Sequence, residues 1–159
     1  QPSFEWQGER FAPNICYEDL FGEELAQRFT DASQAPTVLV NFSNIGWFGD
    51  GKVIDQHLNI SRMRTLELER PMIRATNTGA TAIIDHRGLV QAKAPRATVQ
   101  VLSGEVTGVG QGGEASSITP YARWASQWRL WPARPLALPT LVLVPVVRRR
   151  LPPLPRRHY

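Results

Sequence analysis

Cys16 is the only cysteine in the chain, and it stands between an apolar run and a predicted helix, in the segment NICYEDLFGEEL (residues 14–25). A thiol at the entry to a helix meets the positive end of the helix dipole and free backbone N–H groups, which favour thiolate over thiol. The same N–H groups can hold the oxyanion that forms when a thiolate attacks a carbonyl. The position therefore indicates a nucleophile, and the alternative interpretation is a buried, unreactive cysteine.

The apolar patterns on either side of Cys16 predict the elements that position it. Asp19 is an expected N-cap for the helix that follows the cysteine, and Asp55 for the next helix. Strands and helices in this order are typical of an α/β fold with helices packed on a sheet. We expect a polar loop at 1–10, helices at 19–31 and 55–70, and strands at 11–17, 36–43, 72–77, 80–86, 89–93 and 97–106.

The composition is that of a globular domain with a basic tail. The chain has 159 residues, of which 42% are hydrophobic and 20% charged, and this suits one folded domain. The formal net charge of +4 comes from the C-terminal end, because no acidic residue follows Glu114 while arginines gather beyond it. No basic patch with interleaved aromatic residues accompanies this charge, so we predict no nucleic-acid partner.

The cysteine and histidine content argues against a metal or cofactor site. A single cysteine excludes an internal disulfide and a multi-thiolate metal site. The three histidines, His57, His86 and His158, show no ligand spacing. We therefore predict that the chemistry at Cys16 uses neither a metal ion nor another cofactor.

Several motifs together resemble one enzyme superfamily. NICYEDLFGEEL resembles the nucleophile segment of the nitrilase, or carbon–nitrogen hydrolase, superfamily, which uses a Cys, Glu and Lys set in an α-β-β-α sandwich. The loop SNIGWFG, the Gln-His pair, the Arg-Met-Arg helix and the turn RATNTG are similar to those of the apolipoprotein N-acyltransferase family. TPYAR (residues 119–123) resembles the point where that family's hydrolase-like domain returns to the membrane. The resemblance extends over residues 11–125.

The resemblance implies a divided chain with an incomplete domain. Residues 1–117 correspond to the C-terminal portion of a partial nitrilase-like α-β-β-α sandwich, and residues 118–159 to a membrane-return segment with an irregular Pro/Arg-rich tail. The apolar run at 136–147 is shorter than the about 20 residues of a membrane-spanning helix. The family's glutamate base and lysine are expected upstream of the cysteine, so we expect this chain to be a fragment that is inactive by itself.

The resemblance also implies a two-step acyl transfer. Cys16 would take an acyl chain from a membrane phospholipid as a thioester, and the N-terminal amine of a diacylglyceryl-cysteine lipoprotein would accept it. The implied location is the bacterial inner membrane, with the catalytic domain on the periplasmic side. The implied partners are therefore the phospholipid donor, the lipoprotein acceptor and the membrane.

The family match assigns roles to five residues, each with a simpler alternative. Glu18 would order the site by its charge, or only stabilise the helix dipole. Tyr17 would line the pocket, or pack. Asn44 would donate a hydrogen bond near the thioester, or fix its loop. Trp47 and Phe48 would grip acyl chains or enter the bilayer interface, or fold onto the core.

Two further polar residues are interpreted as structural. His57 invites comparison with the base of a cysteine–histidine pair, but in the resembled family the base is a glutamate, so we predict a structural role. Arg74 with Asn77 is expected to organise the strand turn rather than to contact substrate.

Three functions remain open from the sequence. The first is an acyltransferase fragment. The second is a soluble nitrilase-type amidase that hydrolyses a C–N bond, which would not require the Trp47–Phe48 loop or the membrane-return segment. The third is a non-catalytic remnant, which is distinguished by whether Cys16 reacts at all.

Overall fold

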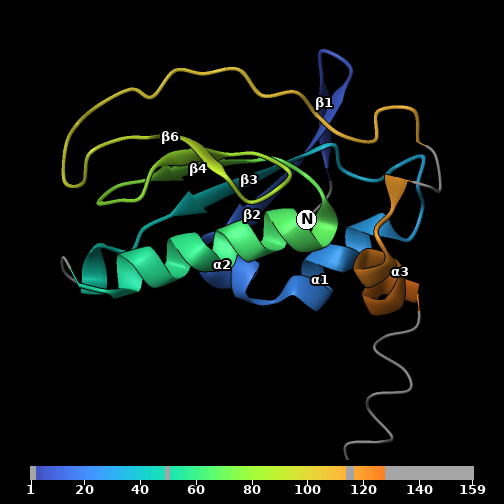
Figure 1. The fold of residues 1–159 in the computed structure, drawn as a ribbon, viewed down its shortest axis with the longest axis horizontal. Coiled ribbons are helices and arrows are strands. Elements are labelled where there is room, and N and C mark those ends of the chain that lie inside the picture. Colours follow the sequence, from blue (N-terminus) through green and yellow to red (C-terminus); the bar gives the residue numbers. More distant parts are fainter. Residues whose placement is uncertain (1–2, 49–50, 114–116, 128–159) are drawn as a thin grey trace, which may run out of the picture. The chain divides into compact units, whose positions relative to one another are not determined.

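A single mixed sheet forms the centre of the fold. The computed structural model describes residues 3–48, 51–113 and 117–127, and Figure 1 shows their arrangement. The sheet has six strands in the order β1-β2-β3-β4-β5-β6. Their bounds are Phe4–Trp6, Glu9–Ile15, Val38–Ser43, Met72–Thr76, Ala82–Ile84 and Val90–Lys93.

The three middle strands are parallel, and the outer strands are antiparallel to their neighbours. β2, β3 and β4 run in one direction, while β1 pairs antiparallel with β2, and β5 and β6 complete an antiparallel meander. The first three residues of β3 are buried, as expected for a β-branched apolar strand that is covered on both faces. The carboxyl ends of β2, β3 and β4 therefore meet at one edge of the sheet.

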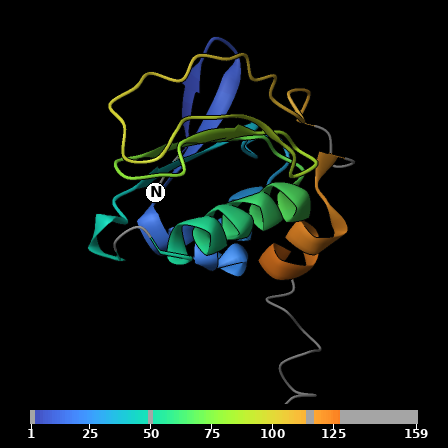
Figure 2. The same ribbon diagram turned by 60° about the vertical axis from the view of Figure 1, so that its left-hand side comes forward.

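Helices cover one face of this sheet. α1 (Gly22–Ala26), α2 (Val53–Leu68) and α3 (Pro120–Gln127) lie on the same side in Figures 1 and 2. α2 turns Ile54, Leu58 and Leu68 inward, where they are at most 7% exposed. Against them lies a row of apolar side chains that are in register across four strands. This row consists of Ala12, Leu39, Met72 and Ile84, all with no exposed surface.

The opposite face of the sheet carries an irregular segment where a strand was expected. Residues 97–106 form no strand, so that prediction is wrong. The segment crosses the sheet on the side away from the helices (Figure 1), and Val99 and Val101 are fully or largely exposed. Alternating β-branched residues favour an extended chain, but a strand also needs a neighbouring edge with which to pair. The segment contacts side chains on this face, because a Cβ atom on Gly104 would clash with Ile83.

Two other predictions need correction near the N-terminus. Residues 1–10 are not a loop, because they contain β1 and the start of β2, joined at Gln7 and Gly8, both with positive φ. The single helix predicted at 19–31 is three short pieces: the 3₁₀ helix η1 (Cys16–Leu20), α1 and the 3₁₀ helix η2 (Gln27–Phe29). Gly22, which packs against the Arg64 guanidinium, begins α1.

The predicted helix caps are also wrong. Asp19 lies within η1 and is completely buried, so it does not cap a helix. α2 begins at Val53 and is preceded by Lys52, which leaves Asp55 inside its first turn, where it pairs with Arg96. A short acidic residue before an apolar pattern favours a cap, but burial and ion pairing have placed both carboxylates elsewhere.

The segment TPYAR begins helix α3 and packs on the rest of the domain. The Thr119 hydroxyl donates to the Glu67 carbonyl at 2.6 Å and accepts the Ala122 N–H at 3.0 Å. Ala122 and Ala125 are buried. None of the helices formed by the described residues combines the length and apolar character needed to cross a bilayer. The predicted Pro/Arg-rich tail and the apolar run at 136–147 lie outside the described residues.

Arg70 joins four parts of the fold from a fully buried position. Its guanidinium donates to the carbonyls of Pro36 at 2.6 Å, Leu68 at 3.2 Å, Glu69 at 3.0 Å and Ser117 at 3.0 Å. It also lies 5.2 Å from the centre of the Phe29 ring. Burial lowers the pKa of Arg70 to about 10, but the group stays protonated at neutral pH. Arg70 therefore ties the end of α2 to the start of β3 and to the segment before α3.

We predict that Arg70→Met lowers the free energy of unfolding by about 3 kcal/mol, because buried carbonyls lose charged donors. Arg70→Lys keeps the charge but not the forked geometry, so we expect an intermediate loss. Urea denaturation followed by tryptophan fluorescence measures both. Exposed Arg87 supplies the control, and Arg87→Met should change stability by less than about 0.5 kcal/mol. Equal stability of Arg70→Met and the parent chain would contradict this role.

Candidate functional site

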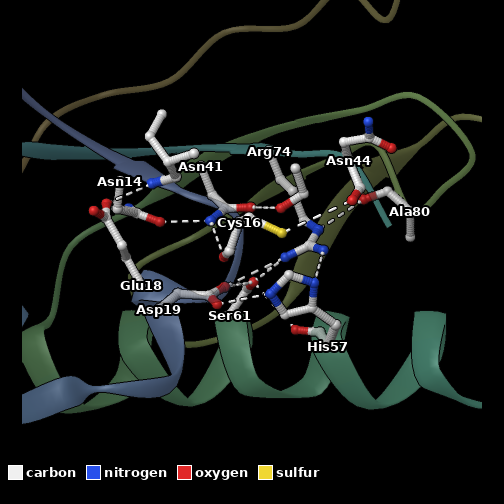
Figure 3. Close-up of polar contacts among 12 residues, drawn as sticks. Asn14, Cys16, Glu18, Asp19, Asn41, Asn44, His57, Ser61, Arg74 and Ala80 are labelled. Atoms are coloured by element: carbon white, nitrogen blue, oxygen red, sulfur yellow. Dashed lines mark hydrogen bonds and ion pairs between the residues drawn. The ribbon is translucent and has the colours of Figure 1, made fainter. Parts of the chain in front are cut away.

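Cys16, Asn44 and Asn77 are the first residues after the three parallel strands. Because these strands end at one edge of the sheet, the three residues come together, as Figure 3 shows for Cys16 and Asn44. The Cys16 thiol lies 3.9 Å from the Asn44 carbonyl oxygen. The Asn77 amide donates to Asn44 Oδ1 at 2.7 Å. In open α/β sheets, ligands bind outside the carboxyl ends of the strands, so this edge is the candidate site.

The backbone of Cys16 adopts a conformation that is rare for a side-chain-bearing residue. Its φ of 51° lies in the left-handed region, at the turn from β2 into η1. The Cys16 side chain is partly exposed. A nucleophile on a sharp, strained turn at the end of a strand is presented to the space above the sheet. The thiol is therefore not fully buried, and its role as the nucleophile stays a prediction.

A buried amide pair holds this turn in place. Asn14 on β2 and Asn41 on β3 are in register and fully buried. Asn41 Nδ2 donates to Asn14 Oδ1 at 2.5 Å and to the carbonyl of Cys16 at 3.1 Å, and its Oδ1 accepts the Ser43 hydroxyl at 2.5 Å. The turn at Cys16 is therefore bonded directly to the middle of the sheet.

Glu18 faces the backbone of the same turn. Its Oε2 accepts the Ile15 N–H at 2.6 Å, which satisfies a donor that the start of η1 leaves free. The carboxylate therefore orders the residue before the nucleophile. This contact is a structural role for Glu18. Its predicted effect on the chemistry through its charge stays a prediction.

Tyr17 packs on a helix behind the nucleophile. Its ring centre lies 5.3 Å from that of His57 on α2. Burial raises the pKa of Tyr17, and the neighbouring Cys16 raises it further, so the phenol remains neutral at physiological pH. Contact with His57 agrees with the packing alternative, and the pocket-lining role stays a prediction.

The aromatic loop lies next to this edge in the short 3₁₀ helix η3 (Gly46–Phe48). Ile45 is buried and anchors the loop, whereas Trp47 is 84% exposed. Trp47 is therefore not folded onto the core, and its predicted contact with lipid stays open. The side chain of Phe48 lies outside the described parts of the structure. Asn44, which bonds both Cys16 and Asn77, fixes the loop to the neighbouring strand ends.

A fully buried polar cluster lies below Cys16 (Figure 3). Asp19 accepts His57 Nε2 at 2.7 Å, the Ser61 hydroxyl at 2.5 Å and Arg74 at 3.4 Å. Arg74 Nη2 also lies 2.8 Å from His57 Nδ1. Since arginine can only donate, Nδ1 accepts and the proton of neutral His57 sits on Nε2. Both ring nitrogens are thus engaged, which agrees with the prediction that His57 is not the base.

Sequence reasoning missed Asp19 and Ser61 in this cluster. The only signal was the spacing of His57 and Ser61, which lie four residues apart and therefore on the same face of the helix as apolar Ile54 and Leu58. Arg74 does organise the strand turn, because its Nε donates to the Ala80 carbonyl at 3.1 Å. Asn77 bonds Asn44 instead of Arg74. Within the described ranges, no three metal-ligating side chains gather to hold an ion.

Comparison with protein families gives a match over most of the chain. Residues 1–111 match the model of the carbon-nitrogen hydrolase family. The matched range includes Cys16, the aromatic loop and the buried cluster. The sheet edge described above therefore lies inside the region that the family shares.

Individual relatives carry a more specific name. An apolipoprotein N-acyltransferase from Verminephrobacter eiseniae is 65% identical over 131 residues, which are 82% of this chain and 24% of the relative. One from Ralstonia nicotianae is 47% identical over 94% of this chain and 26% of its own length. The chain therefore spans about a quarter of the length of these curated relatives.

Solved structures show more distant similarity. An amidase from Nesterenkonia sp. is 15% identical, with a TM-score of 0.47 over 59% of this chain and 37% of the amidase. A carbon-nitrogen hydrolase from Helicobacter pylori G27 is 16% identical, with a TM-score of 0.48 over 57% of this chain and 38% of the hydrolase.

Substitutions of Glu18 can show whether its hydrogen bond or its negative charge stabilises the turn. We predict that Glu18→Ala lowers the free energy of unfolding by about 1 kcal/mol, because the Ile15 N–H loses its acceptor. Glu18→Gln retains an oxygen acceptor and should cost less than half as much. Thermal unfolding followed by circular dichroism measures both.

Exposed Glu24, on the next helix, provides the matched control for Glu18. Glu24→Ala should leave the melting temperature nearly unchanged. If Glu18→Gln is as destabilising as Glu18→Ala, the negative charge rather than the hydrogen bond stabilises the turn.

Proposed function

The chain belongs to the carbon–nitrogen hydrolase family, and on that basis we propose that it forms part of an enzyme that transfers an acyl chain to the N-terminal amine of a lipoprotein. Cys16 is the nucleophile in this proposal. The donor is a membrane phospholipid, and the acceptor is a diacylglyceryl-cysteine at the lipoprotein N-terminus. The specific activity rests on relatives that are about four times as long as this chain.

One observation carries the assignment of Cys16. The only thiol of the chain occupies a left-handed turn at the carboxyl edge of three parallel strands, partly open to solvent. The surrounding turn is bonded to Asn41 and Glu18, so the backbone that carries the thiol is held in place. A nucleophile that is already in position reduces the entropy lost on reaching the transition state.

The proposed reaction proceeds in two balanced steps. In the first, the Cys16 thiolate attacks the carbonyl carbon of a phospholipid ester, a C–S bond forms, and the C–O bond breaks. The departing oxygen takes a proton and leaves as the hydroxyl of a lysophospholipid. In the second, the lipoprotein amine attacks the thioester, a C–N bond forms, the C–S bond breaks, and the amine loses a proton as the thiol is restored. Covalent catalysis thereby divides one difficult transfer into two easier steps.

Trp47 supplies the expected contact with lipid. Its side chain is 84% exposed and lies in the loop next to Asn44, on the same edge as the nucleophile. Exposed tryptophan prefers the membrane–water interface, where its ring is partly buried and its N–H stays hydrated. We propose that this loop faces the periplasmic surface of the bacterial inner membrane, and that residues 118–159 correspond to the segment that returns to it.

The thioester is tested in the full-length product of the gene, in membranes that contain phospholipid. We predict a mass increase of one fatty acyl group on the peptide that contains Cys16, and its removal by neutral hydroxylamine. Cys16→Ser should abolish the adduct. The control is Cys16→Ser combined with Ser33→Cys, which moves the thiol to an exposed turn and should remain unmodified.

The same preparation distinguishes the alternatives. Release of ammonia from a small amide, with no acyl adduct, would indicate an amidase. An unmodified Cys16 in membranes that otherwise support lipoprotein acylation would contradict the proposed nucleophile and favour a non-catalytic remnant.

The role of Trp47 gives a separate prediction. Trp47→Ala should weaken binding to phospholipid vesicles about tenfold, because a tenfold loss corresponds to about 1.4 kcal/mol and burial of a large apolar side chain contributes at least that much. Vesicle flotation measures the binding. Trp6, which is 61% exposed on β1, is the matched control, and Trp6→Ala should bind as the parent does. Equal losses in both variants would contradict a specific lipid contact at the loop.

A further inference from the structure

The buried cluster below Cys16 contains a charge that the proposed reaction has not yet used. Arg74 is 1% exposed and stands on β4 in register with Asn41 of β3. A buried guanidinium is costly unless its N–H groups are bonded and its charge is balanced. The contacts of Arg74 therefore show which groups accept its N–H donors and balance its charge.

Four of the five N–H groups of Arg74 have acceptors. Nε donates to the Ala80 carbonyl, Nη1 to Asp19 and Ser61, and Nη2 to His57. Among the described residues, the remaining N–H on Nη2 has no hydrogen-bond acceptor.

The reactive sulfur of Cys16 lies near the Arg74 guanidinium in the close-up view of Figure 3. A guanidinium in that position attracts a thiolate, because an opposite charge nearby favours the charged form of an ionisable group. Burial lowers the pKa of Arg74, while Asp19 and Cys16 oppose that shift. Asp19 and a Cys16 thiolate therefore compete for one positive charge.

We propose that Arg74 stabilises the Cys16 thiolate and that Asp19 limits this effect by sharing the guanidinium charge, so that the two residues set the thiolate fraction in opposite directions. Arg74 acts here as a positioning residue for the nucleophile. The inference rests on the proposed function only in taking Cys16 as the reacting group.

The other titratable groups around Cys16 are already engaged or neutral. Glu18, on the same turn, is bonded to the Ile15 N–H, and its charge would disfavour a thiolate. Tyr17 is neutral at physiological pH, and both ring nitrogens of His57 on α2 are bonded, one to Asp19 and the other to Arg74. From β3 and the loop after it, only uncharged Asn41 and Asn44 face the sulfur turn. Among the side chains named around Cys16, Arg74 is the only permanent cation.

The experiment measures the pH dependence of alkylation of Cys16 by iodoacetamide in the full-length gene product, followed by mass analysis of the Cys16 peptide. Only the thiolate reacts, so the midpoint of the rate profile reports its formation. Arg74→Gln should move the midpoint up by about one pH unit, which slows alkylation at pH 7 about tenfold. Asp19→Asn should move it down by a similar amount, and Arg74→Lys should partly restore the parent midpoint.

The opposite signs separate this proposal from a purely structural role. Loss of packing would shift both midpoints in the same direction or leave both unchanged, and either result would overturn the proposal. If Arg74→Gln fails to fold, Asp19→Asn and Arg74→Lys still decide the matter, because an Asp19→Asn midpoint at or above the parent value is sufficient to reject it. The exposed residues Arg87 and Asp31 supply the controls Arg87→Gln and Asp31→Asn, which should alkylate as the parent does.

Alkylation requires no lipid, so this result is independent of the acyl-transfer assay. Opposite midpoint shifts without an acyl adduct would support the electrostatic role and contradict the transferase. An acyl adduct without the shifts would support the transferase and contradict the role of Arg74.

Discussion

A row of buried polar side chains across three parallel strands is the constraint on which the site depends. Asn14, Asn41 and Arg74 stand in register on β2, β3 and β4, beneath α2, and each is at most 1% exposed. Their side-chain nitrogen and oxygen atoms, except Asn14 Nδ2, have partners within the described structure, which matters because an unsatisfied buried polar group costs roughly 1–3 kcal/mol. A slip of one residue in any strand would turn that strand's member of the row to the opposite face. The row therefore fixes the strand ends, and with them the turn that carries Cys16.

The ionic part of this network is expected to add little net stability. Asp19 and Arg74 have no exposed side-chain surface, and taking two charges out of water offsets much of their attraction. Asp19 is held by donors from two elements besides its own, α2 and β4, so the arrangement exists only when helix, strand and η1 are packed together. Such a cluster links the formation of the reactive turn to completion of the fold. Arg70 also joins separate elements, near the starts of β3 and β4, but it bonds backbone carbonyls rather than a carboxylate.

Sequence patterns predicted best where local interactions decide the structure. The strand around Val40, the long helix and the turns after β4 and β5 follow from β-branched runs, helical spacing and glycine, and all appear near the expected bounds. The prediction failed at residues 97–106 and at 19–31. In the first case the pattern was right for an extended chain, but no strand edge paired with it. At residues 19–31, the local sequence around Asp19 is the same whether this residue caps a helix or is buried, so the pattern could not distinguish the two.

The sequence by itself determined the α/β order of elements, the single thiol at the end of a strand, and the family to which these motifs belong. Tertiary structure decided which polar groups surround that thiol. His57 meets Asp19 across 38 positions of the chain, and Arg74 meets it across 55. Local spacing reports only neighbours within one helix turn or one strand. Contacts over such separations depend on how α2 packs on the sheet, and burial there turned an expected cap into the acceptor of three donors.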